Sequence, residues 1–371
     1  MKEIIRNIYL NYRKIFLRIL TIKIPNKNLT NHNQEKDINK ILFIRIDRIG
    51  DLVLSTPAIT ALKCAFPKSE LTVLTSITNK SILINNPYVD KIVVYNHRHN
   101  LRDKFRIIKN LRNIRFDLSV DPYVGYELKS ALISAVIGSK LRIGYAAYGR
   151  EACFNLATSI DRTSKHFIDL TLGVLKPLGI HCEDKTPEIF LSKKEKAWAK
   201  NFLNNKVKRN RPIIGIHPGA YYESQRWPVK NFADLTTILQ KKLKSNIIIF
   251  GGPGDHEIID QIAATTTGNV FVHLTDDLRQ FIALMSECSL LICNNSGPLH
   301  IAAALNKATV STMGPTNKAR WMPIGNLHKV LRIDQLPCIG CNLGYCKIKT
   351  HDCMNQITPS MVLDAVKNMV S

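Results

Sequence analysis

Short apolar runs alternate with amphipathic segments over most of this sequence, and the alternation restricts the fold more than any other feature does. The first run, residues 41–46, is almost continuously apolar, which is typical of a strand buried on both faces of a parallel sheet. Segments with helical spacing separate the later runs. The pattern therefore predicts an α/β fold in which helices cover both faces of parallel sheets.

The alternation falls into two sets, with a polar, Lys-rich segment at residues 192–211 between them. A chain of 371 residues is long enough for two domains, and we place these domains at residues 40–191 and 192–371. Strands are expected at residues 41–46, 71–75, 91–95, 118–121, 141–144, 213–217, 247–250, 270–274, 290–293 and 309–313. Two Rossmann-like domains that face one another would bind ligands at the carboxyl ends of their sheets.

Residues 1–39 precede the first predicted strand and form a basic arm and linker. Residues 1–20 carry an apolar stripe at helical spacing, with Lys and Arg mostly off the stripe, and this predicts an amphipathic helix. Such a helix can dock on an anionic membrane surface; the alternatives are packing on the body of the protein and binding a partner helix. No cleavable signal peptide or unbroken apolar span is visible, so a cytoplasmic location is expected.

The formal net charge is +23, from 52 Lys and Arg against 29 Asp and Glu. An excess of this size indicates an anionic partner, such as a phosphate-bearing substrate or an anionic membrane. Zinc-finger and RNA-recognition signatures are missing, and no platform of aromatic and basic residues stands out. We therefore do not expect nucleic acid to be the partner.

The segment after the first strand carries the main candidate for catalysis. Arg48 and Gly50 predict a tight turn, because glycine relaxes the restrictions on the backbone. The turn would place Asp51 at the carboxyl edge of the strand, where its carboxylate can act as a general base toward a sugar hydroxyl. Capping of the following helix is the alternative role for Asp51, and Asp47 is a weaker rival for the role of base.

Two further strand ends carry candidates for binding a diphosphate. Gly219 lets backbone amides approach an anion, and Arg226 can hold a diphosphate through two hydrogen bonds. Ser296 and Gly297 open a helix, so free amides, the helix dipole and a hydroxyl all favour an anion there. The alternatives are an exposed loop with a packed Trp at the first strand end and plain helix capping at the second.

The glycine-rich segment 250–257 argues against a nicotinamide cofactor. Glu257 occupies the place of the third glycine in the dinucleotide-binding fingerprint. Its carboxylate can instead accept hydrogen bonds from ribose hydroxyls, and Asp255 can cap the next helix. No Asp-x-Asp sequence occurs, so we expect amides and Arg226, rather than a metal, to hold the diphosphate.

Four of the nine cysteines cluster near the C-terminus. Cys338 and Cys341 have the spacing of metal ligands, whereas the gaps to Cys346 and Cys353 are irregular for a zinc ribbon. The cluster predicts a structural zinc site or a group of reduced, packed thiols, with a disulfide as a third alternative.

Taken in order, these segments resemble glycosyltransferase family 9, the bacterial heptosyltransferases that build the inner core of lipopolysaccharide. The resemblance covers residues 41 to about 366 and rests on ILFIRIDRIGDLVLSTPAITALKCAFP, IGIHPGAYYESQRWPVKNFADL, IIIFGGPGDHE, LLICNNSGPLHIAAAL and MGPTNKARWMP. It implies a GT-B fold and an inverting, metal-independent transfer from ADP-L-glycero-D-manno-heptose, with no cofactor required. The family's catalytic aspartate falls on Asp51, and its donor-diphosphate turn falls on Ser296 and Gly297.

The resemblance also implies a lipid-linked glycan acceptor, and residues 1–20 would then dock on the inner face of the inner membrane. Two positions depart from the family pattern. Gln225 stands where many members have a Lys that contacts phosphate, and Asn295 stands where many have an Asp that contacts the donor sugar. Both changes remove a charge from the donor site. They leave open a different nucleotide-sugar donor, or a protein that binds a nucleotide sugar or glycan without catalysis.

Overall fold

The structure, a computed structural model, describes residues 13, 38–96, 98–161, 166–208, 210–266 and 270–370. The predicted amphipathic helix at residues 1–20 lies outside the described residues, with the exception of Arg13. Arg13 Nη2 donates to Tyr126 O at 2.5 Å, and its guanidinium lies 4.6 Å from the centroid of the Tyr126 ring. This contact is of the kind expected if the arm packs on the body of the protein.

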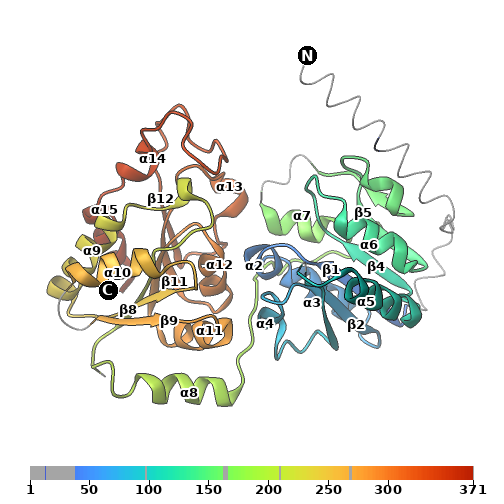
Figure 1. Cartoon of the computed structure of the whole chain (residues 1–371), viewed down its shortest axis with the longest axis horizontal. Helices are drawn as coiled ribbons and strands as arrows, with labels where there is room; N and C mark the ends of the chain where they lie inside the picture. Colours follow the sequence, from blue (N-terminus) through green and yellow to red (C-terminus); the bar gives the residue numbers. More distant parts are fainter. Residues whose placement is uncertain are drawn as a thin grey trace. The chain divides into compact units, whose positions relative to one another are not determined.

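The chain divides into two compact units, Met1–Lys185 and Thr186–Ser371. Each unit is built on its own six-stranded parallel sheet, as the alternation predicts (Figure 1). None of the helices in the described part of the chain combines the length and apolar character needed to span a membrane.

The sheet of the first unit has the strand order β3-β2-β1-β4-β5-β6. Its strands are β1 (Lys40–Arg45), β2 (Glu70–Thr75), β3 (Lys91–Val94), β4 (Leu118–Asp121), β5 (Leu141–Tyr145) and β6 (Leu156–Thr158). The central strand β1 has no exposed surface at Leu42, Ile44, Ile41 or Phe43. Because successive side chains point to opposite faces, both faces of the sheet are covered, which accounts for the continuous apolar run.

α-Helices and short 3₁₀-helices, which carry the label η, connect or follow these strands. They are α2 (Ile49–Val53), α3 (Thr56–Ala65), α4 (Lys80–Leu83), α5 (Leu101–Ile114), α6 (Lys129–Ile137), η2 (Arg150–Cys153), α7 (Phe167–Gly173) and η3 (Lys176–Leu178). On one face of the sheet, α5 and α6 pack Leu111 and Ile137 against Leu42 and Ile44.

The sheet of the second unit has the order β12-β11-β10-β7-β8-β9. Its strands are β7 (Ile213–His217), β8 (Asn246–Gly251), β9 (Val270–Leu274), β10 (Leu290–Asn294), β11 (Ala308–Thr312) and β12 (His328–Leu331). Its helices are α8 (Lys193–Leu203), η4 (Glu223–Gln225), α9 (Val229–Leu243), α10 (His256–Thr265), α11 (Leu278–Glu287), α12 (Gly297–Ala304), α13 (Lys318–Trp321), α14 (Asp352–Asn355) and α15 (Pro359–Val370). The Lys-rich helix α8 is joined to α11 by an ion pair of 2.6 Å between Glu195 Oε1 and Arg279 Nε.

Both sheets reverse their strand order beside the first strand of the unit. In the first unit β1 lies next to β4, and in the second β7 lies next to β10. Ligands of open α/β sheets bind at the carboxyl ends of the strands that flank such a reversal. The residues that follow β1, β4, β7 and β10 are therefore the candidates for a functional site.

Candidate active site

Helix α2 follows β1 directly, and it corrects the predicted turn at Arg48 and Gly50. Arg48 occupies the N-cap position, and Gly50 lies inside the helix, where its carbonyl accepts a hydrogen bond from Leu54 N at 2.9 Å. Leu52 and its neighbour Val53 are fully buried. Because a helical turn buries both side chains and pairs the backbone, the chain forms a helix here instead of an open turn.

Asp51 lies in the first turn of α2, at the carboxyl end of β1 as predicted. Its carboxylate accepts a hydrogen bond from the backbone of Arg48. It does not cap α3, because Ser55 holds that N-cap position and donates its hydroxyl to Asp51 O at 2.6 Å. The side chain of Asp51 is therefore not used to begin the next helix.

Arg45, the last residue of β1, is a buried cation beside these carboxylates. Its side chain is only 1% exposed, and its Nε lies 3.2 Å from Asp47 Oδ1 and 3.4 Å from Asp51 O. Both terminal guanidinium nitrogens are buried without a hydrogen-bond partner among the described residues. The guanidinium lies 5.1 Å from the centroid of the Phe167 ring, so its charge is only partly compensated.

Burial and Arg45 act in opposite directions on the two carboxyl groups. Burial raises the pKa of Asp51, and the positive charges of Arg45 and Arg48 hold that pKa down. Burial raises the pKa of Asp47 to about 7; Arg45 lowers it and the neighbouring Asp51 raises it. Carboxyl groups with raised pKa values are better proton acceptors near neutral pH, so both aspartates remain chemically suited to the role of base.

The end of β4 adds a second buried ion pair that the sequence does not reveal. Asp121 Oδ2 lies 2.5 Å from Arg150 Nη2, and neither side chain has any exposed surface. Arg150 also donates to Glu127 O and, at 3.2 Å, to Ser130 Oγ. Asp121 Oδ1 accepts from Tyr123 N at 3.1 Å. These bonds fix the loop that faces the end of β1.

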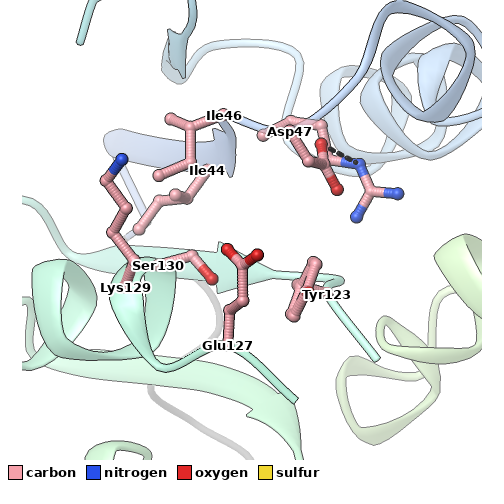
Figure 2. Close-up of a pocket in the computed structure, with 8 residues that line it drawn as sticks. Ile44, Ile46, Asp47, Tyr123, Glu127, Lys129 and Ser130 are labelled. Atoms are coloured by element: carbon pink, nitrogen blue, oxygen red, sulfur yellow. Dashed lines mark ion pairs between the residues drawn. The ribbon is translucent and has the colours of Figure 1, made fainter. Parts of the chain in front are cut away.

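A small, open pocket lies between that loop and the end of β1. It is lined by Ile44, Arg45, Ile46, Asp47, Tyr123, Glu127, Lys129 and Ser130. Figure 2 shows Tyr123, Glu127 and Ser130 on one side of the pocket, with Ile46 and Asp47 on the other. The first unit thus offers a partly polar pocket beside the carboxylate pair.

In the second unit, Asn294 joins the ends of the two central strands. It is fully buried at the end of β10. Its Nδ2 donates to Pro218 O at 2.7 Å, just after β7. Its Oδ1 accepts from Trp227 N and from Thr312 Oγ1, each at 2.9 Å. Asn294, which is not among the residues predicted from the sequence, therefore organises the predicted donor site.

The side chain of Asp255 lies so close to Gly219 that a side chain at position 219 would collide with it. A Cβ at this position would lie 2.3 Å from Asp255 Oδ1. Asp255 occupies the N-cap position of α10 but does not cap the helix; its Oδ2 accepts from Gly252 N at 2.9 Å. The same oxygen lies 3.9 Å from His217 Nε2. Burial lowers the pKa of His217, which favours the neutral imidazole.

Ser296 and Gly297 lie where the anion site was predicted. Ser296 is the N-cap residue of α12, yet its side chain makes no capping bond and donates to Asn294 O at 3.4 Å. Gly297 begins the helix, so its amide is among those without a partner inside the helix. Asn295 is buried directly before them. The alternative of plain capping by the Ser296 side chain is therefore not observed.

The other predicted donor residues are spread around this site. Arg226 Nε donates to Ala220 O at 3.0 Å, and Gln225 Nε2 donates to Thr316 Oγ1 at 3.2 Å. Glu257 is exposed in the first turn of α10, and its carboxylate forms no hydrogen bond or ion pair with another described residue.

Trp227, which follows this loop, is a core residue. Its ring packs edge to face on Phe232 of α9, with the centroids 4.8 Å apart, and its Nε1 donates to Ile357 O at 2.7 Å. The alternative to a diphosphate site at this loop is an exposed loop with a packed Trp, and Trp227 is packed as that alternative expects. Because Trp227 is buried, it anchors the loop that carries Gln225 and Arg226.

The structure does not confirm the predicted zinc site. No group of three or more His, Cys, Asp or Glu in the described part of the chain could hold a metal ion. The thiols of Cys338, Cys341, Cys346 and Cys353 are all free. Cys341 is exposed, whereas Cys353 belongs to the hydrophobic core and packs on Gly314. Burial, and then the charges of the other three thiols, raise the pKa of Cys353 to about 11, as expected for packed, reduced cysteines.

Two Rossmann-type units with candidate binding groups at each strand-order reversal define a GT-B protein, and solved structures with this fold superpose on the chain. The chain belongs to glycosyltransferase family 9 (heptosyltransferase), whose family model matches residues 104–350. It is therefore a glycosyltransferase. The predicted fold class and family are both confirmed.

Individual relatives match over almost their whole length. Lipooligosaccharide heptosyltransferase 2 of Haemophilus ducreyi is 29% identical over 356 residues, covering 90% of this chain and 99% of the relative. A family 9 glycosyl transferase from Veillonella parvula superposes with a TM-score of 0.79 at 22% identity, covering 91% of this chain and 98% of that chain. For the ADP-heptose lipopolysaccharide heptosyltransferase II of Escherichia coli, the TM-score is 0.74 at 24% identity, with coverage of 89% and 98%.

Proposed function

We propose that this protein transfers heptose, with inversion, from an ADP-heptose donor to a lipopolysaccharide core or related glycan acceptor. The observation that carries the proposal is Asp51, half-buried at the strand-order reversal of a family 9 chain with its carboxylate free of any role in α3. In the proposed roles, the first unit binds the acceptor and the second binds the donor.

On the acceptor side, Asp51 takes the proton from the attacking hydroxyl. Burial raises the pKa of Asp51 and so strengthens it as a base, while the positive charge of Arg45 opposes that rise and favours the carboxylate form. The pocket lined by Asp47, Tyr123 and Ser130 offers polar partners for sugar hydroxyls.

On the donor side, the diphosphate binds at the start of α12, where the amide of Gly297 and the hydroxyl of Ser296 can donate to it. Arg226 supplies positive charge, and Gly219 leaves room for the loop to approach. These groups stabilise the departing nucleoside diphosphate, so no metal is required. Glu257 is assigned to the ribose hydroxyls.

The two departures from the family pattern concern the choice of donor. Gln225 and Asn295 present amides where many relatives present charges. Gln225 already bonds to Thr316, and an amide can keep a hydrogen bond to phosphate or sugar without the charge. We therefore retain ADP-heptose as the donor and treat other nucleotide sugars as competitors in the test.

The test measures ADP release from ADP-heptose with a lipopolysaccharide core acceptor, in the wild type and in Asp51→Asn. The substitution keeps the size of the side chain and removes the base, so turnover should fall by about a hundredfold to ten-thousandfold. The rise in melting temperature caused by ADP should be unchanged, because bound ligand stabilises both proteins equally.

Asp47→Asn compares the two carboxylates: an amide can still hydrogen-bond a sugar hydroxyl, so this variant should lose much less turnover than Asp51→Asn. Loss of activity in Asp47→Asn together with full activity in Asp51→Asn would transfer the role of base to Asp47. Turnover with a UDP- or GDP-sugar but not with ADP-heptose would reject the donor. No turnover by the wild type with any nucleotide sugar would favour a non-catalytic binding protein.

A further inference from the structure

The outer face of α5 exposes two large apolar side chains. Leu101 is 82% exposed and Phe105 is 70% exposed, and the two lie one helical turn apart. No other large apolar side chain in the described part of the chain is more exposed than Leu101. The opposite face of α5 packs on the sheet through Leu111 with Ile107 and Ile108. The apolar residues on the outer face therefore have no function in the core.

Helix α5 as a whole is strongly basic. Helix α5 carries five basic residues and one acidic residue; the basic ones are Arg102, Lys104, Arg106, Lys109 and Arg112. The acidic residue, Asp103, is paired with Arg106 at 2.6 Å. Arg102 and Lys109 are exposed and lie on either side of Phe105, three residues before it and four after it. Cations that form no ion pair with another described residue thus flank the exposed apolar side chains.

Helix α8 provides an internal comparison, because it is also basic. Lys193, Lys194 and Lys196 are exposed on it. None of the exposed large apolar side chains lies on α8. The combination of charge and projecting apolar groups therefore distinguishes α5 from a basic helix that is merely solvated.

We propose that the outer face of α5 docks on an anionic lipid surface. Apolar side chains of an interfacial helix insert at the boundary between headgroups and acyl chains, while flanking Lys and Arg are attracted to anionic lipids. Leu101 and Phe105 fit the first requirement, and Arg102 and Lys109 fit the second. A nucleic acid would use the cations and leave Leu101 in water, so the apolar pair favours lipid.

The experiment is cosedimentation of the full chain with vesicles of phosphatidylcholine, with or without phosphatidylglycerol. Leu101→Ser/Phe105→Ser removes the apolar pair, and Arg102→Glu/Lys109→Glu reverses the two charges. Each double variant should lower the partition onto anionic vesicles by about tenfold or more. Lys193→Glu/Lys196→Glu, on α8, is the matched control and should bind as the wild type does.

Because all six side chains are exposed, the melting temperatures should remain those of the wild type. The proposal is overturned if the wild type binds neutral and anionic vesicles equally, or neither. It is also overturned if the α8 variant loses as much binding as the α5 charge variant, or if the apolar variant binds like the wild type. Displacement of the protein from vesicles by duplex DNA, with the apolar pair having no effect, would assign the face to nucleic acid instead.

Discussion

Asn294 Nδ2 lies 2.7 Å from Pro218 O, and this bond joins the carboxyl ends of β10 and β7. The same side chain accepts a hydrogen bond from Trp227 N, at the base of the loop that carries Arg226. One buried amide therefore holds two predicted donor-binding segments in place. An amide is needed there because the site requires a donor and an acceptor on one side chain.

Asn294→Ala should destabilise the protein and weaken donor binding together. The substitution leaves Trp227 N and Pro218 O buried without partners, and the expected loss is roughly 2–4 kcal/mol in the free energy of unfolding. Urea unfolding and ADP titration measure the two effects. The neighbouring Asn295→Ala is the control: it should change stability much less and affect donor binding directly. Equal stability of Asn294→Ala and the wild type would contradict the proposed role of Asn294.

Gly219→Ala should be costly only while Asp255 is present. The new Cβ would lie 2.3 Å from Asp255 Oδ1, so the carboxylate must move and lose its bond to Gly252 N. We expect a loss of about 1–2 kcal/mol in the free energy of unfolding. In an Asp255→Ala background the same substitution should cost little, and this double-mutant cycle is the measurement. Additive effects of the two substitutions would show that the contact is not the constraint.

Asp47 should make the protein less stable as the pH rises toward neutrality. Its folded pKa is about 7 against an ordinary 3.8, so between these values the folded state holds a proton that the unfolded state has lost. Asp47→Asn mimics the protonated form. Its stability relative to the wild type should increase from pH 4 to pH 7, by at most about 4 kcal/mol, and then level off.

Chemical unfolding of both proteins at several pH values provides this comparison, since the carboxyl groups that do not interact with Asp47 contribute equally to each. A difference that does not vary with pH would mean that Asp47 is ionised normally in the folded protein.

Removing the charge of Arg45 should shift the acidic limb of the pH–rate profile upward. Arg45 lowers the pKa values of both Asp47 and Asp51. In Arg45→Gln the base therefore becomes protonated at a higher pH, and the rate falls at a pH where the wild type is still active. Arg45→Lys keeps the charge and should shift the limb less. A profile that keeps its midpoint, only with a lower maximum, would indicate a structural effect alone.

The central strands could be predicted because they are buried on both faces. The runs at 41–46 and 213–217 correspond to β1 and β7 within one residue at each end. The edge strands β6 and β12 are not predicted from the sequence, because they are only three and four residues long and partly exposed. The short helices α2, α4, α13 and α14, of four or five residues, have too few residues to show a helical period.

The candidate site was only partly predictable for a related reason. Asp51 was selected because it directly follows an apolar run, and that is local information. The pair of Asp121 and Arg150 is separated by 29 residues in sequence, so only the folded chain brings it together. Asn294 and Asn295 are adjacent and chemically identical in sequence. Which of them bonds to the ends of the neighbouring strands depends on where β10 ends, and the sequence pattern does not resolve that single residue.

Each sheet is completed entirely by strands of its own half of the chain. The first sheet needs nothing beyond Thr158 for its last strand, so on the ribosome it can assemble before the second half has been synthesised. The long-range parallel pairing within each sheet is slow to form. Each strand, however, has its pairing partners within the same unit, of fewer than 200 residues. Because the chain is synthesised from its N-terminus, the two units can fold one after the other.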